Sequence, residues 1–153
     1  MAETIIIYTD GSSRGNPGPG GYGIVLKWGD KVKEISQGYK RTTNNRMELM
    51  GVIVALESLK TNIYPITIYT DSKYVVDSVE KRWLDGWIKT DFSGGKKNKD
   101  LWVRYYQVSR QFKIKFVWVK GHANNAMNNR CDVLATSAAD GNNLLVDIGF
   151  GVN

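Results

Sequence analysis

The tetrapeptide Ile-Tyr-Thr-Asp occurs twice in the chain, as residues 7–10 and again as residues 68–71. Each copy ends a short run of β-branched residues, 4–10 and 66–71, and such runs predict strands. If the two strands are neighbours in one sheet, their terminal carboxylates converge, and this arrangement is unstable without a cation between them. A hard divalent ion such as Mg²⁺ suits such carboxylates. The alternative is that each Asp caps only a turn or the following helix.

The 153 residues fit one domain with a sizeable core. We expect this domain to span residues 1–140 and residues 141–153 to form a C-terminal tail or lid, because they carry no strong pattern. The first ten residues lack the basic start and the long apolar stretch of a signal peptide, and no apolar run is long enough to cross a bilayer. A lone Cys131 suits a reducing compartment. We therefore expect a cytoplasmic protein that does not enter a membrane.

The order of the predicted elements defines the fold class. After the first strand, an antiparallel meander continues, and residues 83–98 are expected to be irregular. The other predicted elements are the strands 22–28, 33–39, 66–71 and 113–120 and the helices 47–60, 72–81, 101–112 and one after His122. This order predicts an α/β fold with a mixed five-stranded sheet, three antiparallel strands plus two parallel ones, and helices on both faces. Residues 18–23 match the dinucleotide fingerprint GxGxxG, but a strand pattern follows, so this match is accidental.

Glu48 lies at the start of the predicted helix 47–60. Helical spacing places apolar residues of the following turns on the same face, so its carboxylate would point inward. The alternative is that Glu48 is the third residue of a capping box that begins at Asn45. A buried carboxylate would need a partner.

Asp132 lies on the last predicted helix and shares a face with Ala135 and Ala139, small residues that let the helix pack closely on the sheet. Together with Asp10, Glu48 and Asp71 it completes a set of four inward-facing acids. Four carboxylates suit two Mg²⁺ ions across a phosphodiester, where one ion activates water and the other steadies the leaving oxygen. A zinc site would need more His or Cys than the chain supplies.

The positive charge of the chain belongs to one segment. Residues 73–120 contain nine Lys and three Arg against five acids, a net +7, whereas the rest of the chain carries −1. Such a segment is either a solvated charged face or the footprint of a polyanionic partner.

These motifs resemble bacterial type 1 ribonuclease H over nearly the whole chain. The resemblance rests on residues 8–12, 15–23, 42–50, 70–72, 100–102, 119–122 and 130–132. It implies an endonuclease that hydrolyses the RNA strand of RNA/DNA hybrids and leaves 3′-hydroxyl and 5′-phosphate ends. It also implies that the four acids are the catalytic residues and bind two Mg²⁺ ions, with Mn²⁺ as a possible substitute. The expected partner is the hybrid duplex, and we expect a monomer.

The resemblance assigns further roles. His122 would assist proton transfer or product departure, although a lone His near a strand end is otherwise read as a surface residue. Lys73 stands where Gln is common, and Asn124, Asn125 and Asn129 replace a Gly, a His and a Glu. The implied substrate-binding residues are Ser12, Asn16, Asn44, Asn45, Trp83, Trp87, Lys96, Lys97 and Lys99.

Amide side chains can recognise 2′-hydroxyls in the minor groove, and aromatic rings beside cations suit nucleic acid. The asparagines have an alternative duty in turns and caps, and either tryptophan has one in the core. The basic protrusion around Trp83 and Trp87 is several residues shorter than in well-known relatives, so we expect weaker binding of the hybrid. Two rival functions remain: another nuclease of the same fold, and a noncatalytic hybrid-binding module.

Overall fold

The structure, a computed structural model, describes residues 4–120 and 126–150. Its sheet has the strand order β5-β4-β1-β2-β3-β6. The strands are β1 (Ile5–Ser13), β2 (Gly18–Trp28), β3 (Lys31–Thr42), β4 (Ile66–Thr70), β5 (Ile114–Trp118) and β6 (Leu144–Leu145). The antiparallel meander β1-β2-β3 and the parallel pairs β1-β4 and β4-β5 confirm the predicted mixed sheet.

The predicted number of five strands was wrong, because β6 adds a sixth strand at the edge. This strand has only two residues and pairs in parallel with β3 through Gly38 and Tyr39. A two-residue strand is too short to show an alternating pattern, so it could not be predicted from the sequence.

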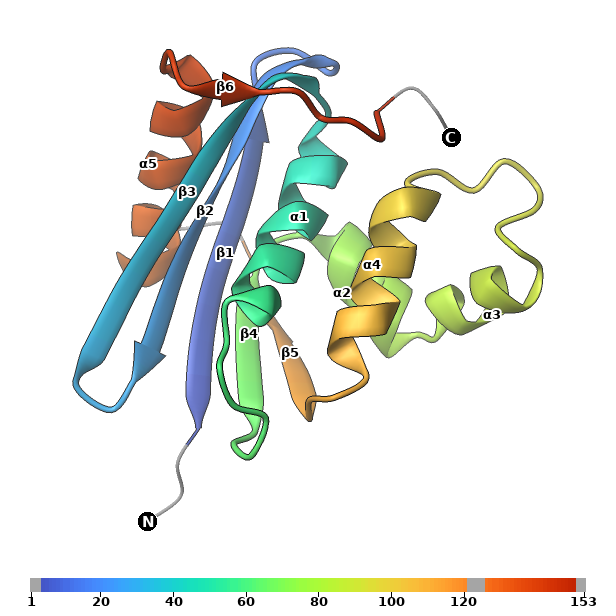
Figure 1. Cartoon of the computed structure of the whole chain (residues 1–153), viewed down its shortest axis with the longest axis horizontal. Coiled ribbons are helices and arrows are strands. Elements are labelled where there is room, and N and C mark those ends of the chain that lie inside the picture. The colour runs from blue at the N-terminus through green and yellow to red at the C-terminus, as the bar shows by residue number, and fades with distance from the viewer. Residues whose placement is uncertain (1–3, 121–125, 151–153) are drawn as a thin grey trace.

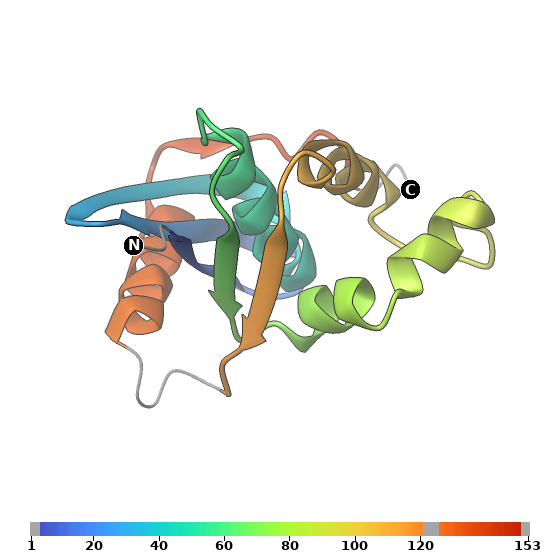
Figure 2. The ribbon, with the colours of Figure 1, turned by 90° about the horizontal axis from the view of Figure 1, so that it is seen from below.

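Helices cover both faces of the sheet, as predicted (Figures 1 and 2). Helix α5 packs on β1, β2 and β3, whereas α1 packs on β1 and β2 from the opposite face, and α4 packs on α1. The helices are α1 (Asn44–Glu57), α2 (Lys73–Glu80), α3 (Trp83–Lys89), α4 (Lys99–Ser109) and α5 (Ala126–Asp140). Among the described residues, none of these helices is both long and apolar enough to span a bilayer.

Glycines in β2 allow α5 to approach the sheet closely. A Cβ atom on Gly23 would overlap the carbonyl group of Cys131, and one on Gly21 would approach the carbonyl oxygen of Ala135 to 2.7 Å. The glycine-rich stretch 18–23 is therefore a strand that receives a helix, which confirms that its match to a dinucleotide fingerprint is accidental.

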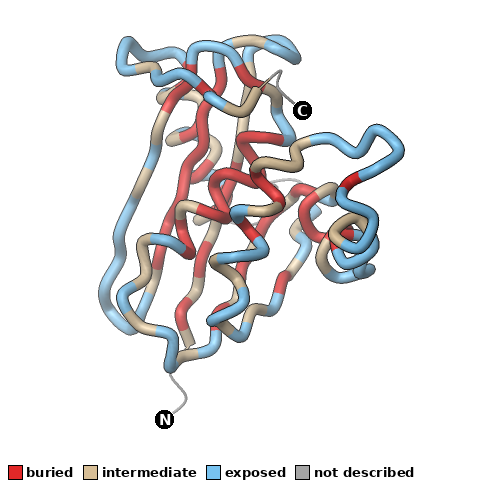
Figure 3. Tube along the Cα trace, turned by 45° about the vertical axis from the view of Figure 1, so that its right-hand side comes forward, coloured by how far each residue is buried: buried red, intermediate tan, exposed pale blue. Residues whose placement is uncertain are grey.

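The segment 83–98 was predicted to be irregular, but its first part forms helix α3. Leu84 is buried, and the ring of Trp87 packs edge-on against Trp102 of α4 with 5.9 Å between centroids. Packing therefore outweighs the weak helical propensity of this short segment, which includes Gly86. The loop that follows is mostly exposed (Figure 3).

Candidate active site

The two copies of Ile-Tyr-Thr-Asp lie side by side in the sheet. Ile7 pairs with Ile68 and Tyr8 pairs with Tyr69 across the parallel strands β1 and β4, and the two tyrosine rings stack at 5.0 Å. Because parallel strands run in the same direction, this register brings Asp10 and Asp71 to the same edge of the sheet. The convergence predicted from the sequence repeat is confirmed.

Glu48 joins these two aspartates from the first turns of α1. Carboxylate oxygens of Asp10, Glu48 and Asp71 all lie within 4.8 Å of one another. The backbone N–H of Gly11 donates hydrogen bonds to Glu48 Oε1 and to Asp10 Oδ1, the latter at 3.0 Å. The capping-box alternative for Glu48 is wrong, because the N-cap is Thr43, whose hydroxyl accepts a hydrogen bond from the backbone N–H of Arg46.

The acidic cluster is buried and carries like charges. Asp10 and Glu48 are 3% and 5% exposed, respectively. Burial raises the pKa of Glu48 well above its ordinary value, and the neighbouring charges of Asp10 and Asp71 raise it further. Both effects oppose the ionised form, so the arrangement favours a bound cation.

The cluster opens into a cavity of about 460 Å³. Asp132 of α5 lines this cavity together with Ser12, Asn44 and Asn45. The one cationic side chain among the described lining residues is Lys73 of α2, whose ammonium group lies 4.7 Å from the centroid of the Trp118 ring. The four carboxylates in the cavity lining offer the oxygen ligands that a hard divalent ion prefers, so the lining residues fit such an ion.

Comparison with known proteins assigns the chain to a family. The family model described as RNase H matches residues 2–140. The chain belongs to the RNase H family. A protein named ribonuclease H from Lachnoclostridium phytofermentans is 53% identical over 153 aligned residues, which cover 94% of this chain and 96% of the relative.

Two solved RNase H structures are similar to this chain. LC9-RNase H1, a type 1 RNase H with the type 2 active-site motif, has a TM-score of 0.80 at 30% identity, over 91% of this chain and 73% of that one. LC11-RNase H1 in complex with an RNA/DNA hybrid has a TM-score of 0.69 at 27% identity, over 89% of this chain and 96% of that one. The RNase H family uses divalent metal ions, in agreement with the carboxylate cluster.

The asparagines that were singled out in the sequence lie near the acidic cluster. Asn16, in the turn between β1 and β2, accepts a hydrogen bond from the backbone N–H of Asn44 at 3.0 Å and so joins the turn to the start of α1. Asn16 and Asn45 also line a second cavity of about 310 Å³. Asn45 borders both cavities, so the two are adjacent.

The lysines of the basic loop fall into different surroundings. Lys97 lines the second cavity, whereas Lys99 forms an ion pair with Asp91 at 2.9 Å. The ammonium group of Lys96 lies 5.9 Å from the centroid of the Trp87 ring. Trp83 is 46% exposed, which suits a surface contact, whereas Trp87 is partly buried and packs on the core. His122 lies outside the described residues, and its role stays a prediction.

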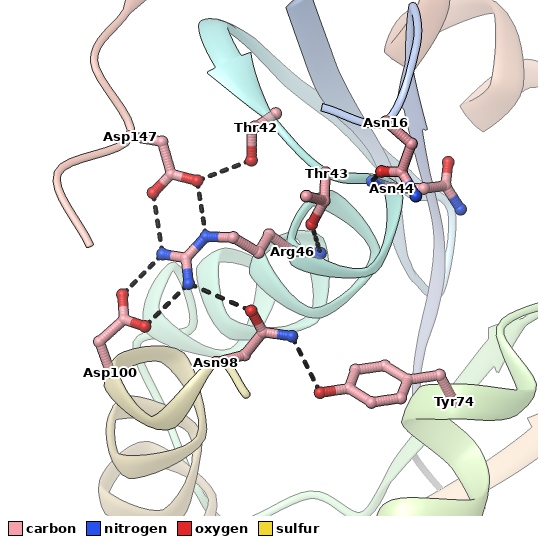
Figure 4. A network of polar contacts seen from close by, with 9 residues as sticks. All are labelled: Asn16, Thr42, Thr43, Asn44, Arg46, Tyr74, Asn98, Asp100 and Asp147. Atoms are coloured by element: carbon pink, nitrogen blue, oxygen red, sulfur yellow. Dashed lines mark hydrogen bonds and ion pairs between the residues drawn. The ribbon is translucent and has the colours of Figure 1, made fainter. Parts of the chain in front are cut away.

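Sequence reasoning missed the polar network beside the second cavity (Figure 4). Arg46 of α1 is buried and pairs with Asp100 of α4 at 2.6 Å and with Asp147 at 2.7 Å. Thr42 donates a hydrogen bond to the same Asp147 carboxylate at 2.6 Å. Arg46 lies inside a cap motif where a charged residue is normally solvated, so no local pattern indicated its burial.

Proposed function

We propose that this protein is a metal-dependent endonuclease that hydrolyses the RNA strand of RNA/DNA hybrids and leaves 3′-hydroxyl and 5′-phosphate ends. The observation that carries the proposal is the convergence of Asp10, Glu48 and Asp71 in a cavity of a chain that belongs to the RNase H family. The hybrid-bound structure of LC11-RNase H1 supports the choice of substrate.

The proposed metal ligands are Asp10, Glu48, Asp71 and Asp132, and the proposed ions are two Mg²⁺, with Mn²⁺ as a substitute. When bound, such ions would activate a water molecule and stabilise charge on the leaving oxygen of the phosphodiester. The protein itself supplies the four carboxylates. Asp10 lies on β1, Glu48 on α1 and Asp132 on α5, and Asp71 directly follows β4. The Gly11 N–H donates hydrogen bonds to two of them, Asp10 and Glu48.

The proposed substrate contacts surround this centre. Ser12, Asn44 and Asn45 line the acidic cavity, so their polar groups could meet the 2′-hydroxyls of the RNA strand close to the scissile phosphate. Asn16 and Lys97 line the adjacent cavity, where they would meet the backbone of a strand. Trp83, Trp87, Lys96 and Lys99 would contact the hybrid further away, and His122 would assist proton transfer or product departure. The proposed active unit is a monomer.

A single set of assays tests the proposal. The RNA/DNA hybrid, double-stranded RNA and duplex DNA, each labelled on one strand, are offered side by side with Mg²⁺, with Mn²⁺ and with chelator. We expect cleavage of the RNA strand of the hybrid alone, and only with a divalent ion. Binding of the hybrid without cleavage would instead indicate a noncatalytic module, and cleavage of DNA would indicate another nuclease of the same fold.

A further inference from the structure

The guanidinium group of Arg46 uses every hydrogen-bond donor that it has. An arginine side chain carries five N–H groups. Nε and Nη2 donate to the two oxygens of Asp147 at 2.7 and 2.9 Å, and Nη1 and Nη2 donate to the two oxygens of Asp100 at 2.8 and 2.6 Å. The second N–H of Nη1 donates to Asn98 Oδ1 at 3.3 Å. The network therefore holds the guanidinium in one orientation (Figure 4).

This saturation limits what Arg46 can do in the second cavity, which it lines with Asn16, Asn45, Lys97 and Asn98. Burial would lower the pKa of Arg46, but the hydrogen bonds to Asp100 and Asp147 raise it above its ordinary value, so the side chain stays charged. With all five N–H groups engaged, the guanidinium has no donor to offer a phosphate. Arg46 therefore offers a ligand in this cavity no direct hydrogen bond, and it positions the groups that can, such as Asn98.

Asn98 is the group through which the network reaches the cavity. Its side chain is fixed at both ends, since Oδ1 accepts from Arg46 and Nδ2 donates to Tyr74 Oη at 3.0 Å. Trp102 Nε1 donates to the same hydroxyl at 2.8 Å, and Tyr74 lines the acidic cavity. Asn98 has a φ of 65°, a left-handed conformation that asparagine tolerates better than most residues. Lys97 directly precedes this fixed residue.

Asp147 brings the segment after α5 into this network. Its side chain is 2% exposed and also accepts a hydrogen bond from the Thr42 hydroxyl. The same segment contributes Phe150, which lines the second cavity and whose ring centroid lies 5.4 Å from the guanidinium carbon of Arg41. The segment predicted as a tail or lid therefore supplies both a buried anion and part of a cavity wall.

We propose that Asp147 is a positioning residue for the nucleic-acid substrate: by fixing Arg46, it holds Asn98, and with it the preceding Lys97, in the wall of the second cavity that Asn16 and Asn45 also line, so that this cavity is preformed for the backbone of one strand. This inference rests on the proposed function. Preformed contacts reduce the ordering that binding requires, so loss of Asp147 weakens substrate binding and leaves the chemistry at the acids unchanged.

The test compares Asp147→Asn with Glu57→Gln in hybrid cleavage under substrate saturation and at several salt concentrations. Glu57 is a matched control. It pairs with Arg104 at 2.6 Å and joins α1 to α4, as the Arg46–Asp100 pair does, but at the other end of α1. We expect Asp147→Asn to raise KM by about 5- to 20-fold, to change kcat by less than about threefold and to flatten the salt dependence of KM. Glu57→Gln keeps the wild-type KM.

A merely structural role predicts a different result. Partial unfolding lowers the concentration of active enzyme, so kcat falls while KM stays at the wild-type value, and that outcome overturns the proposal. If Asp147→Asn does not fold, Asp100→Asn replaces it, because Asp100 is partly exposed and Arg46 then keeps its pair with Asp147. A smaller rise in KM is expected for that variant, and an unchanged KM contradicts the proposal.

A double mutant separates positioning from an independent contact. When Asp147→Asn is combined with Lys97→Gln, the rise in KM should be smaller than the product of the two single effects, because Asn98, which sets the backbone position of Lys97, is already released in the Asp147 variant. Effects that multiply within about twofold would show independent sites and overturn the inference. If the wild-type protein cleaves no hybrid in the same assay, the proposed function fails instead, so the two failures are distinguishable.

Discussion

Two groups of carboxylates lie near the start of α1, and they differ in how their negative charge is compensated. Glu48 faces Asp10 and Asp71 in the acidic cavity, and the pKa of Glu48 rises through burial and like charges. Arg46, two positions earlier and roughly 200° around the helix, binds two carboxylates with four hydrogen bonds and donates a fifth to Asn98 Oδ1. The first group is arranged for a cation that the polypeptide does not supply, and the second carries its own cation. The charges of the acids in the acidic cavity should therefore support activity and lower stability. The charges of the carboxylates bound to Arg46 should instead support stability and substrate binding.

The largest difference should appear in catalysis. Asp10→Asn or Asp71→Asn keeps the shape of the side chain but removes the charge that a divalent ion needs, so we expect cleavage to fall by about 10³-fold or more. Binding of the hybrid should survive in both variants, which a filter or anisotropy assay checks. Activity within tenfold of wild type at saturating Mg²⁺ would contradict the assignment of these acids as metal ligands.

The reverse comparison concerns stability. Asp147→Ala leaves the buried Arg46 with one carboxylate partner, and removal of one partner of a buried ion pair typically costs about 3–5 kcal/mol of unfolding free energy. Glu57→Gln removes a pair that is 36% and 43% exposed, and such pairs contribute about 0–1 kcal/mol. Urea denaturation of both variants measures the difference. Equal losses in the two variants would mean that the Arg46 network is no more stabilising than a surface pair.

The two groups also differed in how well the sequence predicted them. Asp10 and Asp71 could be predicted because strand patterns are local and the repeat fixes the register of neighbouring parallel strands. The Arg46 network could not, since Asp147 lies 101 residues away in a segment without periodicity. The pairing of a long-range partner depends on where the chain folds back, and no pattern within one element records this.

A third prediction compares stabilities without metal. In the folded protein, the pKa of Glu48 lies above its ordinary value of 4.5. The proton on Glu48 therefore stabilises the fold fully below pH 4.5, and this contribution to the free energy of unfolding is lost as the pH rises through the raised pKa. At pH 7 in chelator, Glu48→Gln should therefore stabilise the protein by roughly 1–2 kcal/mol, since like charges about 4 Å apart repel by a few kcal/mol in a protein.

The gain from Glu48→Gln should largely disappear near pH 4, where the wild-type carboxyl is mostly protonated in both the folded and the unfolded state. Added Mg²⁺ should also reduce it, because the ion stabilises the wild-type fold by binding to it. Denaturation curves at pH 4 and pH 7, with and without Mg²⁺, measure these effects. A loss of stability in metal-free Glu48→Gln at pH 7 would show that the acids in the cavity are not under mutual repulsion.

The smallest expected effect extends the comparison of paired and unpaired charge to the basic loop. Lys97 lines the second cavity and forms no ion pair within the described residues, whereas Lys99 is held by Asp91 at 2.9 Å. A phosphate contact by Lys97 would release a counterion, so Lys97→Gln should raise KM by about 3- to 10-fold and make the slope of log KM against log salt shallower by about one. Lys99→Gln should change both quantities less, because Lys99 must first leave Asp91.

Both variants should keep kcat, since neither lysine lines the acidic cavity. Equal salt slopes for Lys97→Gln and wild type would mean that this part of the basic segment is a solvated face, and a larger effect of Lys99→Gln would mean that hybrid binding displaces its ion pair.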